Sequence, residues 1–103
     1  MNTCLVAPEA EEDIFHIWLY LLREAGMETA NRIEREILEA LGSLAETPGK
    51  GHRRPDLTRR NVLFYTLYQY MVVYRAGAPL EIIAVLHGKR NVKRLFSRRL
   101  TRS

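Results

Sequence analysis

The chain has few of the features that mark secreted or membrane proteins. It holds one cysteine, Cys4, so no internal disulfide can form, and we interpret Cys4 as a small apolar residue within a strand. No apolar run approaches the roughly 20 residues that a membrane-spanning helix needs. The opening MNTCLVAPEAEEDI has no basic segment before its short apolar stretch, so it does not resemble a signal peptide. We therefore expect a cytoplasmic protein that does not enter a membrane.

The sequence also lacks the common motifs of metal and nucleotide chemistry. Its three histidines, His16, His52 and His87, show no ligand spacing with one another or with Cys4. There is no glycine-rich phosphate loop and no serine-centred nucleophile turn. We expect no metal and no cofactor. We expect His16 to face solvent. For His52, a position at the surface accounts for the residue as well as a chemical role does.

What is present suits one small domain. The chain has 103 residues, of which 47% are hydrophobic, enough for a single modest core. A domain of this size buries only about 60–70% of its unfolded surface, so a permanent partner would add stability. We expect the domain to span residues 1–96, followed by a basic, frayed tail at residues 97–103.

Charge is divided between the two halves of the sequence. Residues 1–49 carry ten acids and three bases, whereas residues 50–103 carry two acids and thirteen bases, which together give the net charge of +4. One interpretation is a solubilising helix face beside a disordered basic tail. The other is a basic working surface that attracts nucleic acid, or an acidic protein that covers it. The placement of bases next to strand ends favours the second.

Two helices are predicted in the first half. Pro8 suits a first helical turn, and the acids that follow favour the positive end of the helix dipole. Apolar residues then recur at spacings of three and four up to Gly26, which ends the first helix. A second helix begins near Met27 or Glu28 and ends near Ala45. The two predicted stripes are Ala10, Ile14, Ile17, Trp18, Leu21 and Ala25, then Ala30, Ile33, Ile37, Leu41 and Leu44. With only Gly26 between them, the helices should form an antiparallel hairpin.

Strand-like runs flank this hairpin and follow a polar, arginine-rich loop at residues 50–61. The runs are residues 3–6, 62–68, 70–75 and 80–86. The resulting order, β-α-α-β-β-β, predicts an α+β domain. Its helix hairpin packs on one face of a mostly antiparallel four-stranded sheet, and a short basic helix or tail follows.

The most informative stretch is the last strand and its continuation. An apolar run, residues 80–86, has the composition of a strand buried on both faces, and it delivers His87, Lys89 and Arg90 to one edge of the domain. Two interpretations of His87 remain open: a ring nitrogen forms a hydrogen bond with a backbone group, or the side chain is catalytic. Lys93, Arg94, Arg98 and Arg99 continue the basic segment. Val92, Leu95 and Phe96 lie beside them and either dock on the domain or hold a partner's helix.

Four tyrosines occupy the two preceding strands: Tyr65, Tyr68, Tyr70 and Tyr74. Aromatic rings beside arginines can stack on bases. Half-buried cross-strand pairs are the commoner arrangement and are the expectation here.

Four segments together resemble one known family. They are Ala10-Glu11-Glu12-Asp13-Ile14, the run LAETPGKG at residues 44–51, Val73-Tyr74-Arg75, and IIAVLHGKR at residues 82–90. In this order and at this length the chain resembles the RelE/ParE toxin superfamily, over about residues 3–96. The resemblance implies a toxin of a type II toxin–antitoxin system.

The two branches of that superfamily imply different chemistry. RelE-like members cut messenger RNA on the ribosome, which requires proton transfer and phosphate stabilisation. They share a lysine-rich strand, an arginine three residues before the tyrosine of the "LVYR" strand, an arginine in the "GKR" turn and a tyrosine six residues later. Here only Arg90 matches, since Met71 and Phe96 occupy two of those positions and residues 62–65 hold no lysine.

The VLHGKR ending is instead similar to the ParE branch, whose members are implied to inhibit DNA gyrase by binding. By this resemblance we expect growth arrest without an established nuclease site, and a complex with a cognate antitoxin, as a heterotetramer or larger. The residues expected to bind the target are Arg59, Arg60, Arg75, His87, Lys89, Arg90, Lys93 and Arg94. Those expected to bind the antitoxin are Trp18, Leu22, Ile33, Ile37 and Phe96. The alternative is a ribosome-dependent ribonuclease that uses His87 and Arg90.

Overall fold

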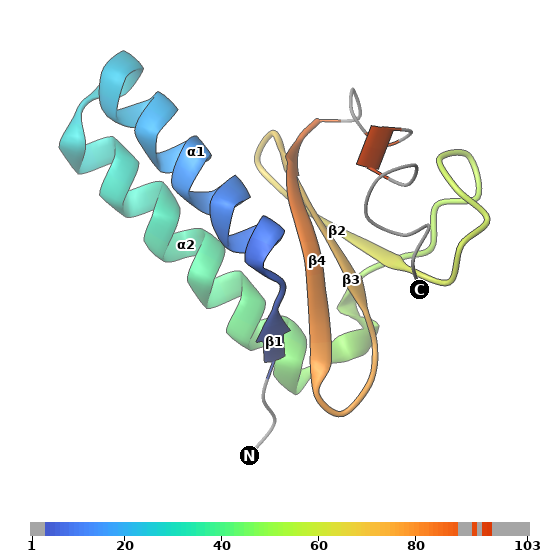
Figure 1. Ribbon diagram of the computed structural model, residues 1–103. Coiled ribbons are helices and arrows are strands. Elements are labelled where there is room, and N and C mark those ends of the chain that lie inside the picture. Colours follow the sequence, from blue (N-terminus) through green and yellow to red (C-terminus); the bar gives the residue numbers. More distant parts are fainter. Residues whose placement is uncertain (1–3, 89–91, 93, 96–103) are drawn as a thin grey trace.

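The computed structural model describes residues 4–88, 92, 94 and 95. The elements, in chain order, are β1 (Cys4–Val6), α1 (Pro8–Ala25), α2 (Met27–Glu46), the short 3-10 turn η1 (Pro48–Lys50), β2 (Leu63–Leu67), β3 (Tyr70–Arg75) and β4 (Leu80–His87). The predicted β-α-α-β-β-β order is confirmed (Figure 1). β3 matches its predicted range, β2 is one residue shorter at each end, and β4 is one residue longer at its end.

The four strands form one mixed sheet in the order β1-β4-β3-β2. β2, β3 and β4 pair antiparallel, while the short β1 pairs parallel to β4. A register shift between Val73 and Tyr74 marks a bulge, which places Ile83 as an extra residue of β4. The mostly antiparallel sheet is thus confirmed, with a parallel edge.

The helix hairpin depends on residues at its ends. Pro8 lies in the first turn of α1, where its missing N–H costs no helical hydrogen bond, and Glu9 and Glu11 lie near the positive end of the helix dipole. At the other end Gly26 adopts φ 94°, a conformation that side chains disfavour, and α2 begins at once. The antiparallel hairpin predicted from Gly26 is confirmed.

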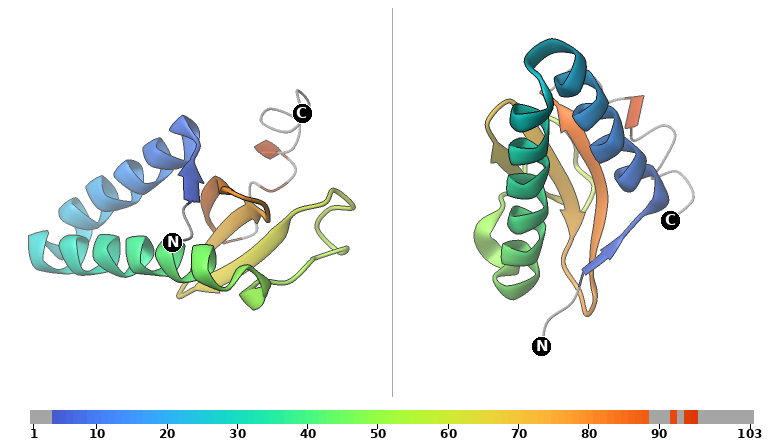
Figure 2. Two further views of the ribbon diagram at one scale, coloured as in Figure 1. Left: turned by 90° about the horizontal axis from the view of Figure 1, so that it is seen from below. Right: turned by 90° about the vertical axis from the view of Figure 1, so that its left-hand side faces the viewer.

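The helix hairpin covers one face of the sheet, as Figure 2 shows from two directions. A first core lies between the hairpin and that face. Its buried side chains are Ala10, Ile14, Leu21, Ala30, Ile33, Ile37, Leu41, Leu44, Tyr70, Val72, Tyr74, Leu80, Ile82 and Val85. The predicted stripe of α2 is buried along its whole length. That of α1 is confirmed except at Ala25, which is exposed at the turn.

A second core covers the opposite face of the sheet. It holds the buried side chains Val62, Phe64, Met71, Val73, Ile83, Ala84, Leu86, Val92 and Leu95. Leu57, from the loop between η1 and β2, packs against it. Of the two readings of the apolar residues after β4, docking on the domain is therefore correct for Val92 and Leu95. Phe96 and the tail at residues 97–103 lie outside the described residues.

Candidate functional site

Charge follows the architecture of the domain. All ten acidic residues of the first half of the sequence lie on α1 and α2. The loop between η1 and β2 instead carries Arg53, Arg54, Arg59 and Arg60, with Asp56 as its one acid. This loop extends beyond β2, away from the helices (Figure 1). The acids of the two helices and the four arginines of this loop are thus spatially separate.

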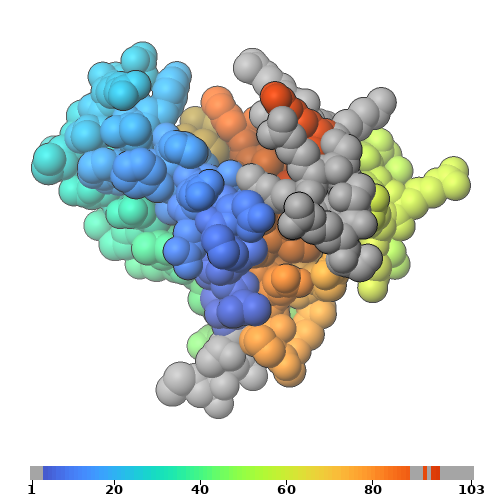
Figure 3. All heavy atoms as spheres, viewed as in Figure 1, coloured from blue at the N-terminus to red at the C-terminus, as the bar shows by residue number. Residues whose placement is uncertain are grey.

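Part of the expected target-binding set is brought together on the face opposite the helices. Arg59 and Arg60 are exposed in the loop whose Leu57 packs in the second core, and Arg94 is exposed between Val92 and Leu95, which are buried in that core. The space-filling view shows the yellow-green loop on the side of the molecule away from α1 and α2 (Figure 3). Lys89, Arg90 and Lys93 lie outside the described residues.

Arg75 does not belong to this group. It is the last residue of β3 and pairs with Glu81 across the hairpin, with 3.2 Å between Nη1 and Oε1. His87 pairs with Tyr70 at the other end of the same two strands. Five strand residues separate the two ends, or roughly 17 Å. Antiparallel pairing thus places Arg75 and His87 at opposite ends of the sheet. Their expected role in binding the target stays a prediction.

His87 is exposed at the end of β4. Its ring lies beside that of Tyr70, with 5.4 Å between the centroids. The adjoining backbone is closed by Gly88, whose N–H donates to the carbonyl of Gln69 at 2.8 Å. A backbone amide therefore makes the hydrogen bond that closes the sheet edge, which one of the two interpretations had assigned to the His87 ring.

The tyrosines have structural roles. Tyr70 and Tyr74 are buried in the first core, so neither can stack on a nucleobase. The Tyr74 hydroxyl donates to the carbonyl of Pro48 at 2.6 Å and accepts from the N–H of Gly51 at 2.9 Å. Burial raises the pKa of Tyr74. These bonds fix the start of the loop on the sheet.

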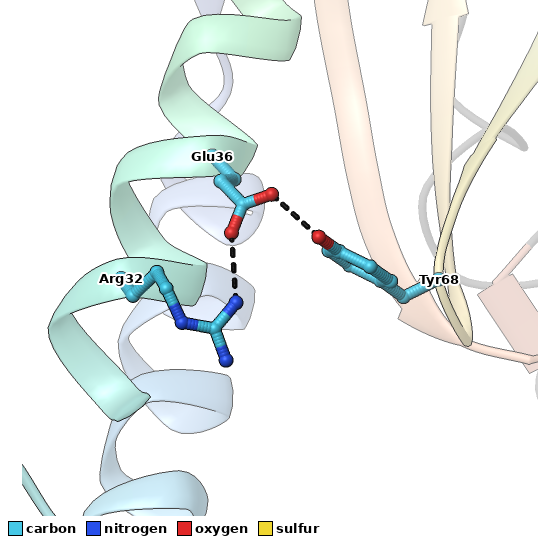
Figure 4. A network of polar contacts seen from close by, with 3 residues as sticks. All are labelled: Arg32, Glu36 and Tyr68. Carbon is cyan, nitrogen blue, oxygen red and sulfur yellow. Dashed lines mark hydrogen bonds and ion pairs between the residues drawn. The ribbon is translucent and has the colours of Figure 1, made fainter. Parts of the chain in front are cut away.

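Tyr68 is an exposed exception. It is a turn residue between β2 and β3 with φ 57°, and its hydroxyl donates to Oε1 of Glu36 on α2 at 2.6 Å. Arg32 binds the other oxygen of the same carboxylate at 3.0 Å (Figure 4). The hydrogen bond from Tyr68, more than the nearby arginines, lowers the pKa of Glu36, and the same bond raises the pKa of Tyr68.

The expected antitoxin-binding residues divide into two groups. Ile33 and Ile37 are buried in the first core, so as surface residues they were wrong choices: the periodicity that selected them is that of the core. Trp18 and Leu22 are half-buried at the surface of α1, where the Trp18 indole N–H donates to Asn31 on α2 at 2.8 Å.

Phe15 was missed by the sequence reasoning. It is 53% exposed and stacks on Trp18, with ring centroids 6.2 Å apart. Its spacing of three from Trp18 and seven from Leu22 was the available signal, because these positions share one side of a helix. We call Phe15, Trp18 and Leu22 the α1 strip.

The described part of the chain has neither a membrane-spanning helix nor a cluster of metal ligands. None of its helices is long and apolar enough to cross a membrane. Nor do three or more of its histidine, cysteine, aspartate or glutamate side chains gather where a metal ion could bind.

Comparisons with known proteins agree with this architecture. The family model described as "ParE toxin of type II toxin-antitoxin system, parDE" matches residues 5–92. A curated relative, "Toxin ParE1" of Caulobacter vibrioides, is 33% identical over 93 residues, which cover 90% of this chain and 96% of the relative. A solved structure titled "Chromosomal ParDE TA system from P. aeruginosa" shares the fold. Its TM-score is 0.74 at 21% identity, over 85% of this chain and 97% of that one.

The fold and these matches define a small toxin of a type II toxin–antitoxin system, within the RelE/ParE superfamily. The chain belongs to the ParE toxin family, and the resemblance inferred from its four segments is confirmed.

Proposed function

We propose that this toxin arrests growth in the cytoplasm by binding DNA gyrase with the face of the sheet opposite its helices. The observation that carries this proposal is the separation of charge, since the acids lie on α1 and α2 while exposed Arg59, Arg60 and Arg94 lie beside the second core. Membership of the ParE family supports gyrase as the target. A cationic face favours an enzyme engaged with DNA.

Binding rather than catalysis is supported by the surroundings of Met71 and His87. Met71, at the position where RelE-like members carry an arginine, is 4% exposed within the second core. His87 has a tyrosine ring as its described neighbour, rather than a carboxylate that would orient it as a base. The ribonuclease alternative would depend on His87 and Arg90.

A cognate antitoxin is proposed to cover the α1 strip. An amphipathic helix suits this surface, because Phe15, Trp18 and Leu22 have the spacing of one helix face. The rest of the antitoxin would continue across the helix hairpin to the sheet edge, forming a hetero-oligomer. Ile33 and Ile37 are omitted from this interface, and Phe96 remains an untested candidate.

A supercoiling assay with purified gyrase tests the target. Arg59→Ala/Arg60→Ala should reduce inhibition about tenfold or more, since both cations lie on the proposed face. The matched control is Arg23→Ala/Arg35→Ala, which removes two exposed cations from the helices and should inhibit like the original chain. Unchanged supercoiling in the presence of the unaltered toxin would refute gyrase as the target.

A second assay addresses the ribonuclease. Purified ribosomes and a defined message should remain intact in the presence of the toxin. Cleavage that disappears in His87→Ala and Arg90→Ala would replace the proposed mechanism with catalysis.

A further inference from the structure

A shallow basic hollow lies along the outer edge of β2. It is lined by Lys50, His52, Arg54, Phe64, Tyr65 and Thr66. Three of these side chains are basic and two carry hydroxyls, and none is a carboxylate. Lys50 and His52 are exposed, whereas Arg54 is half-buried. The hollow is separate from the three exposed arginines to which the gyrase proposal is assigned.

The cations of the hollow are held in place by other groups. The Lys50 ammonium donates to the Ser43 hydroxyl, a neutral partner that leaves its charge uncompensated. Arg54 uses Nε and Nη2 to bind the two oxygens of Asp56, at 3.0 and 2.7 Å. A guanidinium has five N–H donors, so its Nη1 side retains donors for a ligand.

The backbone of β2 adds a further donor. His52 N–H and C=O pair with Phe64 on the outer edge of the strand. Alternation along an antiparallel ladder turns the N–H and C=O of Thr66 in the same outward direction, beside the Thr66 hydroxyl. Cations, hydroxyls and an outward N–H together are the donor set of an oxyanion site.

The same geometry argues against an added peptide strand. His52 already occupies the edge at Phe64, and the turn at Tyr68 follows Thr66 by two residues. A partner strand would therefore find outward backbone groups at Thr66 alone in this part of β2. The exposed Arg53, next to Arg54, extends the positive charge along the loop, which suits a polyanion longer than one carboxylate.

We propose that this hollow binds a phosphate group of a duplex DNA backbone. Lys50 and Arg54 supply the charge, and Thr66 positions the phosphate oxygens at the sheet edge. The contact is to the backbone, so it is independent of base sequence. It also requires no gyrase, and so it goes beyond the inhibition proposed above.

The test is fluorescence anisotropy of the purified full-length toxin with a labelled duplex of random sequence, at several salt concentrations. Each phosphate contact contributes about 0.9 to the slope of log affinity against log salt. Lys50→Ala/Arg54→Ala should therefore lower that slope by about 0.9, because the two cations hold one phosphate. Between about 50 and 200 mM salt, the affinity of the unaltered toxin should then fall about three- to fourfold more than that of the variant.

Two control variants separate binding from other effects. Arg23→Ala/Arg35→Ala removes the same charge from the helices and should leave the slope unchanged. Ser43→Ala removes the partner of Lys50 while keeping the charge, and should bind DNA nearly as well as the unaltered toxin. Asp56→Asn should bind more tightly, because it removes a negative charge beside Arg54. Thermal unfolding of each variant verifies that it folds.

Three results would overturn the proposal: absence of DNA binding by the unaltered toxin, equal loss in both double variants, or tighter binding of an acidic peptide than of DNA at the same residues. The last would identify the ligand as a protein segment. DNA binding by an unaltered toxin that does not inhibit gyrase would refute only the proposed function.

Discussion

At the scale of the residue, Tyr74 joins three parts of the chain. Its side chain is 0% exposed in β3, and its hydroxyl bonds both Pro48 and Gly51, more than twenty positions earlier. Gly51 has no space for a side chain, since an added Cβ would lie 2.7 Å from Cε1 of the tyrosine ring. The LAETPGKG run is therefore matched to the tyrosine of the VYR segment by packing.

Tyr74→Phe should destabilise the fold by about 1–3 kcal/mol, because it leaves a buried N–H and a carbonyl without their partner. The expected fall in melting temperature is about 4–8 °C for each kcal/mol in a domain of this size. Urea and thermal unfolding measure both. Tyr20→Phe is the control, since that tyrosine is 56% exposed, and it should change stability by less than about 0.5 kcal/mol.

The bond between Tyr68 and Glu36 predicts a pH dependence. Because the folded-state pKa of Glu36 lies below its ordinary value of 4.5, its stabilisation is present above that pH and is lost as the pH falls through the folded pKa. Because the folded-state pKa of Tyr68 lies above its ordinary value of 10.0, its stabilisation is present below pH 10.0 and is lost as the pH rises through the folded pKa.

The comparison that tests this coupling is the unaltered chain against Tyr68→Phe, which keeps the ring and the turn but removes the hydroxyl. The difference in unfolding free energy should be greatest between about pH 5 and 9 and should shrink on both sides. Urea titrations at acid, neutral and alkaline pH measure it. A difference that stays constant from acid to alkali would contradict the coupling.

Which residues could be predicted from the sequence depends on the range of the interactions that place them. His16 was correctly placed in solvent, since helical periodicity is local. The distance of Arg75 from His87 could not be predicted, because it depends on how two strands pair. Ile33 and Ile37 were misread, because periodicity identifies an apolar side without saying whether the protein's own sheet or a partner covers it.

At the scale of the element, Val92 and Leu95, which follow β4, cover part of the second face of the sheet. Val92, Arg94 and Leu95 have helical conformation, and the two apolar side chains lie in the second core. Without them that face of the sheet would expose Met71, Val73 and Leu86. These two side chains thus help to close the core, while Arg94 is exposed to solvent.

Leu95→Ala should lower the free energy of unfolding by about 2–4 kcal/mol, since it removes buried apolar volume and leaves a cavity. Leu38→Ala makes the same truncation at a position that is 52% exposed, and should change stability by less than about 0.5 kcal/mol. Equal stability of the two variants in urea would mean that the segment does not pack on the sheet in solution.

The elements themselves were well predicted because their signals are local. Both helices could be predicted from the 3.6-residue periodicity together with Pro8 and Gly26. The last two strands could be separated by the turn Gly77-Ala78-Pro79. The parallel pairing of β1 with β4 was not predicted, nor was the hollow beside β2. Both depend on contacts between segments distant in sequence, such as the pairing of His52 with Phe64.

At the scale of the whole molecule, the domain has two surfaces of opposite character. The helices carry the acids and the α1 strip, whereas the loop and the segment after β4 carry the described cations of the opposite side. The sheet and its two cores separate these surfaces. Toxicity and neutralisation by the antitoxin should therefore be separable by mutation.

Phe15→Ala should abolish neutralisation while keeping toxicity. Removing an exposed aromatic anchor should weaken antitoxin binding about tenfold to a hundredfold, and it should hardly affect stability, because Phe15 is 53% exposed. Co-expression with the cognate antitoxin, read as colony formation, and titration calorimetry measure the two effects. Tyr20→Ala is the matched control: an aromatic of similar exposure, about 140° further around α1, which should still be neutralised.

Arg59→Ala/Arg60→Ala should give the converse result, with growth restored in cells that lack the antitoxin and nearly unchanged antitoxin affinity for the α1 strip. The reason is geometric, since the loop lies on one side of the sheet and the strip on the other. If Phe15→Ala and Arg59→Ala/Arg60→Ala each lost both toxicity and antitoxin affinity, one shared surface would serve both partners. The antitoxin would then act by covering the toxic residues directly, rather than by holding the toxin from its helical side.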